Sequence, residues 1–245
     1  MEVHPHTHTE RKKWTHYFWE FLMLFFAVFC GFLAENFREH QVEKNRERQY
    51  IKSFIEDLEA DTIDYKNRIV ACDKTINISD SVIILLNRPD RDKWATDIYY
   101  FLRQIHRSGE FTTNDRTIIQ LRNAGGMRLI SNKAVSDSIV DYYKMVESMK
   151  FIYEEQIDHK RSLRSHFSQI LDGVDYGKVV DEENYVIKPN EPLKLRLTDL
   201  NAINTCTIIL QNIKGINQGI KRRMKQMKEK AKVTRGFIQK EYHLK

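Results

Sequence analysis

The stretch that decides the fold is "IKSFIEDLEADTIDYKNRIVACDKTINISDSVIILL", Ile51 to Leu86. Along it, apolar residues recur at alternating steps of four and three. The pattern occupies positions 51, 55, 58, 62, 65, 69, 72, 76, 79, 83 and 86, and nine of these eleven are apolar or aromatic when Cys72 is counted. This spacing, sustained over five repeats, predicts one long helix with a coiled-coil-like seam. The following "NRPDRD" ends it, because Pro89 disfavours a helical conformation at Arg88.

Helical spacing returns in most of the remaining chain. Steps of three or four between apolar residues, with cap and turn residues between the segments, predict further helices at 95–107, 116–123, 133–171 and 198–242. Residues 173–196 break the pattern, so we expect an irregular insert there, with "NYVIKP" as a short strand or extended chain. Only 4 Pro and 9 Gly occur in 245 residues. The sequence therefore predicts an all-α fold, a long-helix coiled-coil-like bundle of about four to five helices.

The N-terminal region has the length and composition of a membrane anchor. Residues 21–34 carry no charge, and residues 14–34 are long enough as a helix to cross roughly 30 Å of hydrocarbon. Trp14, Tyr17 and Trp19 cluster at one end, as interfacial aromatic residues do. A cut after residue 34 would leave bulky Phe32 at the −3 position, which signal peptidase does not favour. We therefore predict an uncleaved transmembrane helix that continues into the body.

This anchor divides the chain into three parts: a tail (1–13), a transmembrane helix (14–34) and a helical domain (35–245). Three Lys/Arg precede the helix and four follow within fifteen residues, so the positive-inside count is nearly tied. The short basic tail favours a cytoplasmic N-terminus and a periplasmic body in a bacterial inner membrane. The basic C-terminal helix argues for the opposite orientation.

One stripe of the anchor predicts a helix–helix contact. Glu20, Ala27, Gly31 and Ala34 lie on this stripe, and small residues four apart let two helix backbones approach closely. A carboxyl group near the membrane interface needs a partner, a proton or access to water. The stripe is therefore a candidate seam of a homo-oligomer or of a complex with a partner membrane protein. Alternatively, Glu20 reaches water beside incidental small residues.

Two other groups of residues invite a functional interpretation. Residues 220–245 hold ten Lys/Arg and two Glu in a chain of net charge +6, and the candidate basic surface is Lys221, Arg222, Arg223, Lys225 and Lys228. This basic surface would suit an anionic partner or lipid, or it would be a solvated helix face. Nucleic acid is disfavoured as a partner because few aromatic residues lie among the basic ones. His4, His6 and His8 alternate as metal ligands can, but an unstructured tail offers no preorganised site.

Signatures of catalysis and cofactor binding do not occur in the sequence. It contains no GxSxG, HExxH, phosphate-binding loop, dinucleotide fingerprint or calcium loop, so we expect no enzyme activity, no cofactor and no metal site. Acidic clusters such as Glu56, Asp57 and Glu59 are expected to face solvent. Cys72 and Cys206 could pair only outside the cytoplasm and with Cα atoms within about 7 Å.

Three stretches together resemble a known family. They are "FLMLFFAVFCGFLAEN" (21–36), "RERQYIKSFIEDLEADT" (46–62) and "TIIQLRNAGGMRLISNKAVSDSIVDYY" (117–143). The chain is similar here to a family of uncharacterised bacterial single-pass membrane proteins, over roughly residues 10–145. The resemblance implies a membrane anchor and a helical body, and it adds no catalytic residue.

Two functions remain in view. The first is a membrane-anchored structural or protein-interaction protein, whose partners are the bilayer and a second copy or another membrane protein. The second is a sensor or regulatory subunit that relays a signal across the membrane through its helices. Helical seams with a free outer face would favour the structural or protein-interaction function. A polar cavity between helices would favour the sensor or regulatory function. An enzyme would need buried acids or histidines that converge on one place.

Overall fold

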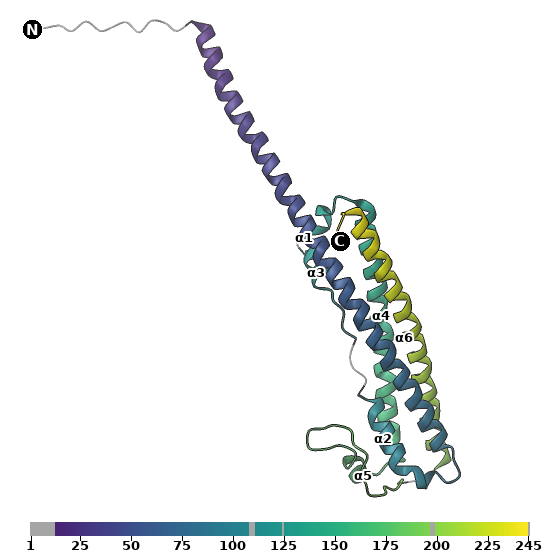
Figure 1. The fold of residues 1–245 in the computed structure, drawn as a ribbon. Helices are drawn as coiled ribbons and strands as arrows, with labels where there is room; N and C mark the ends of the chain where they lie inside the picture. The colour runs from purple at the N-terminus through teal and green to yellow at the C-terminus, as the bar shows by residue number, and fades with distance from the viewer. Residues whose placement is uncertain (1–12, 108–110, 124, 197–198, 245) are drawn as a thin grey trace, which may run out of the picture. The chain divides into compact units, whose positions relative to one another are not determined.

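The computed structural model describes residues 13–107, 111–123, 125–196 and 199–244 (Figure 1). Its α-helices are α1 (Trp14–Leu86), α2 (Ala95–Ile105), α3 (Arg116–Asn123), α4 (Lys133–Phe167), α5 (Gly173–Gly177) and α6 (Leu200–Glu241), with 3-10 turns η1 (Arg91–Trp94) and η2 (Gly126–Leu129). Within these residues β-structure is limited to two isolated bridges, so the all-α prediction is confirmed. The chain forms two compact units that divide between Tyr50 and Ile51.

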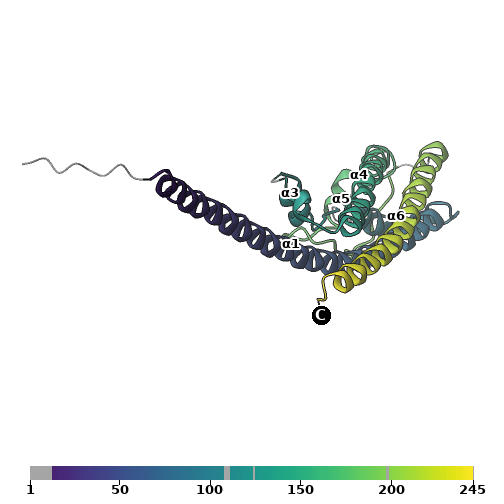
Figure 2. The same cartoon turned by 90° about the horizontal axis from the view of Figure 1, so that it is seen from above.

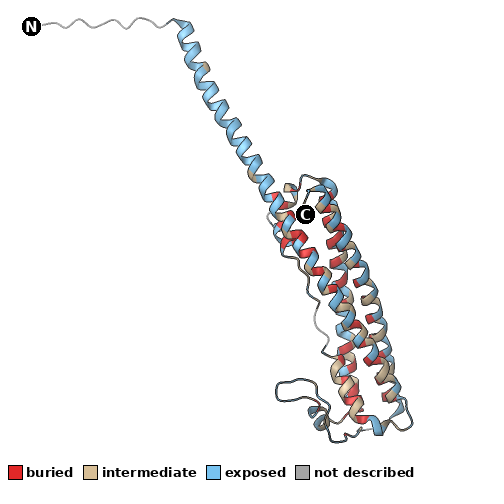
Figure 3. Cartoon of the chain, in the orientation of Figure 1, coloured by how far each residue is buried: buried red, intermediate tan, exposed pale blue. Residues whose placement is uncertain are grey.

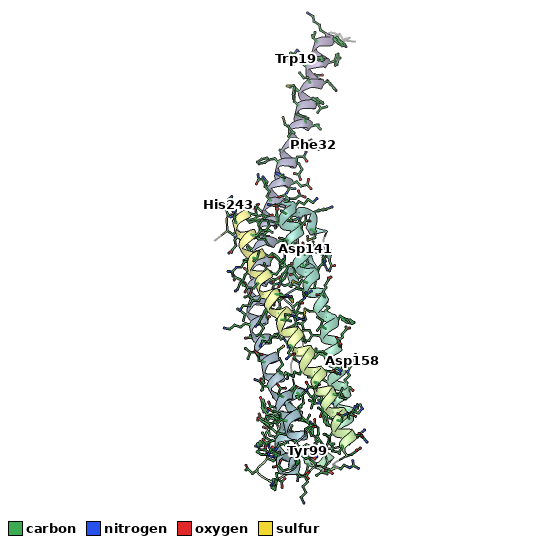
Figure 4. The ribbon with its side chains drawn as sticks, turned by 90° about the vertical axis from the view of Figure 1, so that its right-hand side faces the viewer. Trp19, Phe32, Tyr99, Asp141, Asp158 and His243 are labelled. Carbon is green, nitrogen blue, oxygen red and sulfur yellow. The ribbon has the colours of Figure 1, made fainter. Side chains whose placement is uncertain are left out.

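The described part of the first unit is the N-terminal portion of α1. It contains an 18-residue window of mean hydropathy 1.9, none of which is buried. Trp19 and Phe32 both project from the helix and are 62% exposed (Figure 4). Figure 3 shows the same exposure along most of this segment. The helix is long and apolar enough to cross a membrane, a property that N-terminal signal sequences share.

In the second unit, the α1 seam faces the interior as its spacing predicts. Seven of the eleven seam positions are buried and the other four are half-buried. Figure 3 shows this buried stripe on α1, with matching stripes on α4 and α6. The helix ends at Leu86, just before the predicted proline turn. A seam at steps of three and four therefore selects the buried face of α1.

A line of polar pairs fixes how α1 and α6 align. We call it the polar ladder: Arg235 Nη1 to Glu59 Oε1 at 3.0 Å, Lys221 Nζ to Asp73 Oδ1, Lys214 Nζ to Asp80 Oδ1 at 2.6 Å, and Asn87 Nδ2 donating to Thr207 Oγ1 at 3.2 Å. From rung to rung the residue number rises on α1 by 14, 7 and 7, and falls on α6 by the same steps. The two helices are therefore antiparallel and keep one heptad register along this whole length.

The third long helix, α4, packs against both. Buried Gln156 of α4 donates from Nε2 to Asn217 Oδ1 of α6 at 2.9 Å, and α4 runs antiparallel to α6. Its direction matches that of α1, since Tyr142 meets Tyr65 while Tyr153 lies further along, under the Arg68 guanidinium at 5.9 Å. Figures 1 and 2 show the three helices side by side in this unit.

The segment from α2 to α3 returns along α4 as an interrupted fourth helix. The His106 ring packs on Phe167 near the end of α4, with ring centroids 5.2 Å apart. Phe111 stacks on Tyr153, with ring centroids 4.8 Å apart, and Tyr153 lies fourteen residues before Phe167 on α4. The segment therefore runs antiparallel to α4 and completes a helical bundle.

Local signals locate the helix boundaries well. Asn132 caps α4 by accepting from Val135 N at 3.2 Å, and Gly125 adopts the left-handed φ of 61° that suits glycine in a turn. Asp199 caps α6; the predicted start at 198 lies outside the described residues. The predicted continuation of α4 to residue 171 is wrong, because the helix ends at Phe167.

The insert at 173–196 is mostly irregular, as expected, but it contains the short helix α5, which Asp172 caps through Val174 N and Asp175 N. Of the alternatives for "NYVIKP", the extended one is correct, with a single bridge between Val180 and Val186.

Both body cysteines are buried free thiols. The ladder places Cys72 next to the rung of Asp73 and Lys221, whereas Cys206 adjoins the rung of Asn87. About sixteen residues of α6 separate these two levels, or roughly 24 Å along the helix axis. This distance is far too large for a disulfide within one chain.

The polar ladder lacks one rung, and this makes a stability prediction. The missing heptad position would pair Lys66 with Lys228, which carry like charges. Lys66→Glu should replace repulsion with attraction and raise the free energy of unfolding by about 0.5 kcal/mol, as exposed ion pairs do. Chemical unfolding of the full chain in a non-ionic detergent measures this.

Lys74→Glu makes the same charge change at an exposed α1 position outside the ladder. An equal gain from Lys74→Glu, or no gain from Lys66→Glu, would contradict the assigned register.

Candidate functional site

A cluster of buried polar residues joins α1, α3 and α4. We call it the Asp61 cluster: Asp57, Asp61 and Tyr65 from α1, Asn114 and Thr117 at the start of α3, and Tyr142 and Tyr143 from α4. The prediction that the acidic cluster at 56–59 faces solvent is wrong for Asp57, which is 7% exposed. It packs inward because its backbone position lies beside the seam.

Asp61 is the centre of the hydrogen-bond network. Its Oδ1 accepts from Asn114 N at 3.1 Å and from Asn114 Nδ2 at 2.9 Å. Its Oδ2 accepts from the Tyr142 hydroxyl, which also bonds the Tyr65 hydroxyl at 2.8 Å. Both carboxylate oxygens are therefore engaged by protein donors, and buried polar groups so satisfied stabilise one specific arrangement.

Asp57 acts as a cap from another helix. Its Oδ2 accepts from the backbone N–H of Thr117, in the first turn of α3, at 3.2 Å. The sequence predicts Thr113, Asn114 and Asp115 as local caps, but Asn114 instead bonds to α1. A carboxylate at a helix N-terminus satisfies an otherwise unpaired donor and interacts well with the helix dipole. Asp57 and Asp61 thus attach the return segment to α1.

Burial governs the ionisation of the cluster. Desolvation raises the pKa of Asp61, while the hydrogen bonds from Tyr142 and Asn114 oppose this rise. Burial and the nearby carboxylates also raise the pKa values of Tyr65 and Tyr142, so both hydroxyls keep their protons and remain donors. Both Asp61 oxygens and the three tyrosine hydroxyls are thus occupied by other groups of the bundle, whereas the Thr117 hydroxyl has no hydrogen-bond partner among the described residues.

A second site is a pocket beside α4, which we call the basic pocket. It has a volume of about 590 Å³ and is lined by His106, Phe111, Lys150, Tyr153, Glu154, Gln156, Ile157, Lys160, Arg161 and Arg164. Four of these residues are cations and one is a carboxylate. The pocket therefore carries a positive charge.

Lys160 is the least expected residue of this lining. It is only 8% exposed and has no hydrogen bond or ion pair within the part of the chain that the structure describes. Burial lowers the pKa of its ammonium to about 8. A lysine that is largely buried without a carboxylate beside it is energetically costly, so Lys160 differs from the many paired lysines on this surface.

His106 is a second unsatisfied group in the same pocket. Both ring nitrogens are buried, and neither has a hydrogen-bond partner among the described residues. Burial, followed by the charges of Arg164, Lys160 and Arg103, lowers its pKa to about 4. The ring is therefore neutral at pH 7, with one N–H to donate and one nitrogen to accept.

The predicted basic surface is partly used inside the bundle. Lys221 pairs with Asp73, and Arg223 Nη2 donates to Ser148 Oγ at 2.9 Å. Arg222 and Lys225 line a groove of about 320 Å³ together with Asp73 and Lys221, and Lys228 is half-buried. The five residues are thus not one uniform free surface.

The candidate anchor seam lies on the exposed N-terminal part of α1. Glu20 Oε1 pairs with His16 Nε2 at 2.9 Å, one turn earlier. Ala27, Gly31 and Ala34 are exposed, and a Cβ at Gly31 would meet nothing within 4 Å. His4, His6 and His8 lie outside the described residues. Elsewhere in the described chain, no group of three His, Cys, Asp or Glu could hold a metal ion.

The sequence interpretation missed Asp61, His106 and Lys160. A signal for Lys160 was present: beyond Tyr153 the α4 seam continues at 156, 160, 163 and 167, again at steps of three and four. This places Gln156 and Lys160 at core positions, where a lysine is unusual.

Comparisons of the chain with protein-family models, with curated proteins and with solved structures find no match. The function is therefore inferred from the chain's own geometry.

Removing the Asp61 carboxylate should destabilise the bundle. Asp61→Ala removes the acceptor of three hydrogen bonds, from Asn114 N, Asn114 Nδ2 and the Tyr142 hydroxyl, and should lower the free energy of unfolding by about 3 kcal/mol. Asp61→Asn keeps one acceptor oxygen and should lose less. Glu56→Ala, at an exposed position on the same helix, should change stability by less than about 0.5 kcal/mol. Urea unfolding of the full chain in detergent measures all three; equal losses at 56 and 61 would contradict the network.

His106 should make the bundle sensitive to acid. The folded pKa of about 4 lies below the usual 6.5, so the unfolded chain binds more protons between these values. Stability is therefore complete above pH 6.5 and falls as the pH drops towards 4, by about 2 kcal/mol at pH 5.

His106→Leu should remove this part of the loss when unfolding at pH 7 and pH 5 is compared, and His159→Leu serves as the matched control on α4. A wild-type pH dependence that persists unchanged in His106→Leu would refute the assignment.

Proposed function

We propose that the chain is a membrane-anchored helical protein of structural or protein-interaction type, without catalytic chemistry. The observation that supports this most is a free apolar stripe on α1. Ile63, Val70 and Ile84 point away from the bundle and are 62%, 64% and 63% exposed. They are spaced by 7 and 14 residues, so they lie along one line of the helix. We call this line the outer stripe.

The outer stripe has the features of a helix-pairing surface. Asn77 occupies the remaining heptad position and is exposed. A single polar residue in such a series specifies register at some cost in stability. At its end, Ile84 lines a shallow pocket of about 290 Å³ with Leu85, Trp94 and Phe101. Exposed aliphatic residues in a repeated arrangement support a protein partner.

The partner that we propose is a second copy of this chain. Residues 14–34 would span a bacterial inner membrane once, with the N-terminus in the cytoplasm and the body in the periplasm. Two copies inserted in the same sense would present the same α1 residues to each other across a two-fold axis. The stripe of Glu20, Ala27, Gly31 and Ala34 would provide a further contact between the anchors. The similarity to bacterial single-pass proteins stays a prediction.

A sensor or regulatory subunit is the second candidate. The basic pocket favours it, because a polar cavity between helices can receive a ligand. A ligand in the basic pocket would contact the end of α2 and one face of α4. Helix α4 in turn packs against α1 through the contact of Tyr153 with Arg68. If the protein is a sensor, a bound ligand should change the pairing of two chains. If it is a structural protein, the pairing should not depend on a ligand.

Disulfide cross-linking in membranes tests the first proposal. In a Cys30→Ser background, Asn77→Cys places a thiol on the outer stripe, and mild oxidation should convert most of the chain into a covalent dimer. Adding Val70→Lys should abolish the dimer, since a charge would replace an aliphatic contact. Glu155→Cys, at an exposed position of α4, is the control and should stay monomeric.

The cross-linked chain should remain in the membrane pellet after a carbonate wash and leave it when residues 14–34 are deleted. If the Asn77→Cys variant stays monomeric, or if the Glu155→Cys variant forms the dimer in equal yield, pairing through α1 is ruled out. Release of the full chain by carbonate would rule out the anchor.

A further inference from the structure

We propose that the basic pocket binds a phosphate-bearing small molecule with an aromatic or apolar portion, and that Lys160 is its principal counter-charge. The inference concerns residues of the second unit alone, so it does not depend on the membrane anchor or on self-association.

The first argument is that the Lys160 charge is uncompensated. The neighbouring groups that affect its ionisation after burial itself are Cys72 and Arg68. Arg68 has the same sign, and burial raises the pKa of the Cys72 thiol to about 11, so that this thiol is neutral at pH 7. Lys160, which is only 8% exposed as a residue, thus faces no anion within the described chain. A bound anion would supply one.

The second argument concerns the charge of the ligand. Lys150, Arg161 and Arg164 lie on one face of α4 with Glu154 among them, and Asp158 already pairs with Arg161 at 3.1 Å. Asp158 lies on the outer side of α4 (Figure 4). After Glu154 and Asp158 are counted against the four cations, two positive charges remain. A phosphate dianion would balance them, and guanidinium groups bind phosphate oxygens with matched geometry.

The third argument concerns the uncharged part of the ligand. Phe111 and Tyr153 stack with an interplanar angle of 12° and form an aromatic wall, and Ile157 beside them is 40% exposed. The neutral His106 ring has nitrogens without hydrogen-bond partners in this lining. An aromatic or apolar group would contact the wall, and a polar atom on it would satisfy His106. Bare inorganic phosphate would use only the cations.

The basic pocket differs in this respect from the basic surface of α6. There, Lys221 is neutralised by Asp73, and Lys225 lines a groove that includes the same carboxylate. Positive charge alone therefore does not single out a site on this protein. What distinguishes the basic pocket is that Lys160 is largely buried and has no ion-pair partner among the described residues.

Calorimetric titration of the full chain in a non-ionic detergent, with phenyl phosphate as the probe, tests the proposal. Wild type should bind it saturably, and at least about tenfold more tightly than inorganic phosphate. Lys160→Met keeps the length of the side chain and removes the charge; it should weaken binding at least about tenfold, which corresponds to about 1.4 kcal/mol. Lys225→Met removes one charge outside the pocket and should bind as wild type does.

Each alternative result overturns a stated part of the proposal. Absence of saturable binding to folded wild type, or unchanged binding by Lys160→Met, removes the site. Equal affinity for inorganic phosphate removes the aromatic portion, and equal affinity for benzoate removes the preference for phosphate. Circular dichroism checks that Lys160→Met is folded. If it is not, Arg164→Gln, at an exposed position, should still weaken phenyl phosphate binding, and full affinity in that variant refutes the site.

Discussion

The antiparallel register between α1 and α6 is the constraint on which the rest of the bundle depends. One register brings the α1 seam inward and at the same time aligns the rungs from Glu59 to Asn87 with their partners on α6. A shift by one residue would turn the seam away and separate every rung. Exposed ion pairs contribute little individually. Their value here is that three of them, together with the hydrogen bond from Asn87 to Thr207, agree with the apolar seam on the same alignment.

Given this register, buried polar groups specify the remaining contacts. The amides of Gln156 and Asn217 must meet between α4 and α6, because each would otherwise be buried without a partner. Asp57 and Asp61 likewise hold the short α3, which has too few residues to be stable alone. The bundle therefore combines an apolar interior with a small number of polar contacts that allow one arrangement of the return segment.

Two features lie outside this self-consistent set. The outer stripe of α1 repeats the heptad spacing without a partner on the described chain, and Lys160 is buried without a counter-ion. Both differ from similar residues elsewhere in the molecule. The aliphatic residues of the seams are buried or half-buried, and the half-buried lysines of the polar ladder, Lys214 and Lys221, are paired with carboxylates. Departures from internal consistency are where function is expected.

Much of the fold was predictable from sequence. The α1 and α6 seams and the proline turn after Leu86 depend on residues close together in the chain, where spacing and helix-termination rules apply. Short-range rules failed where a distant group intervened. Asn114 resembled a local cap and instead bonds Asp61, more than fifty residues earlier. Asp57 resembled a solvated acid and instead caps α3.

By itself, the sequence determined that the chain is helical, which face of each long helix is apolar, and that residues 14–34 suit a membrane. These properties follow from periodicity and composition along a single helix. Only the tertiary structure decided that Cys72 and Cys206 lie at different levels, that Lys221 is paired, and that Lys160 is not. The physical reason is that pairing and burial depend on which helix face lies opposite, and that is set by the register between segments far apart in the chain.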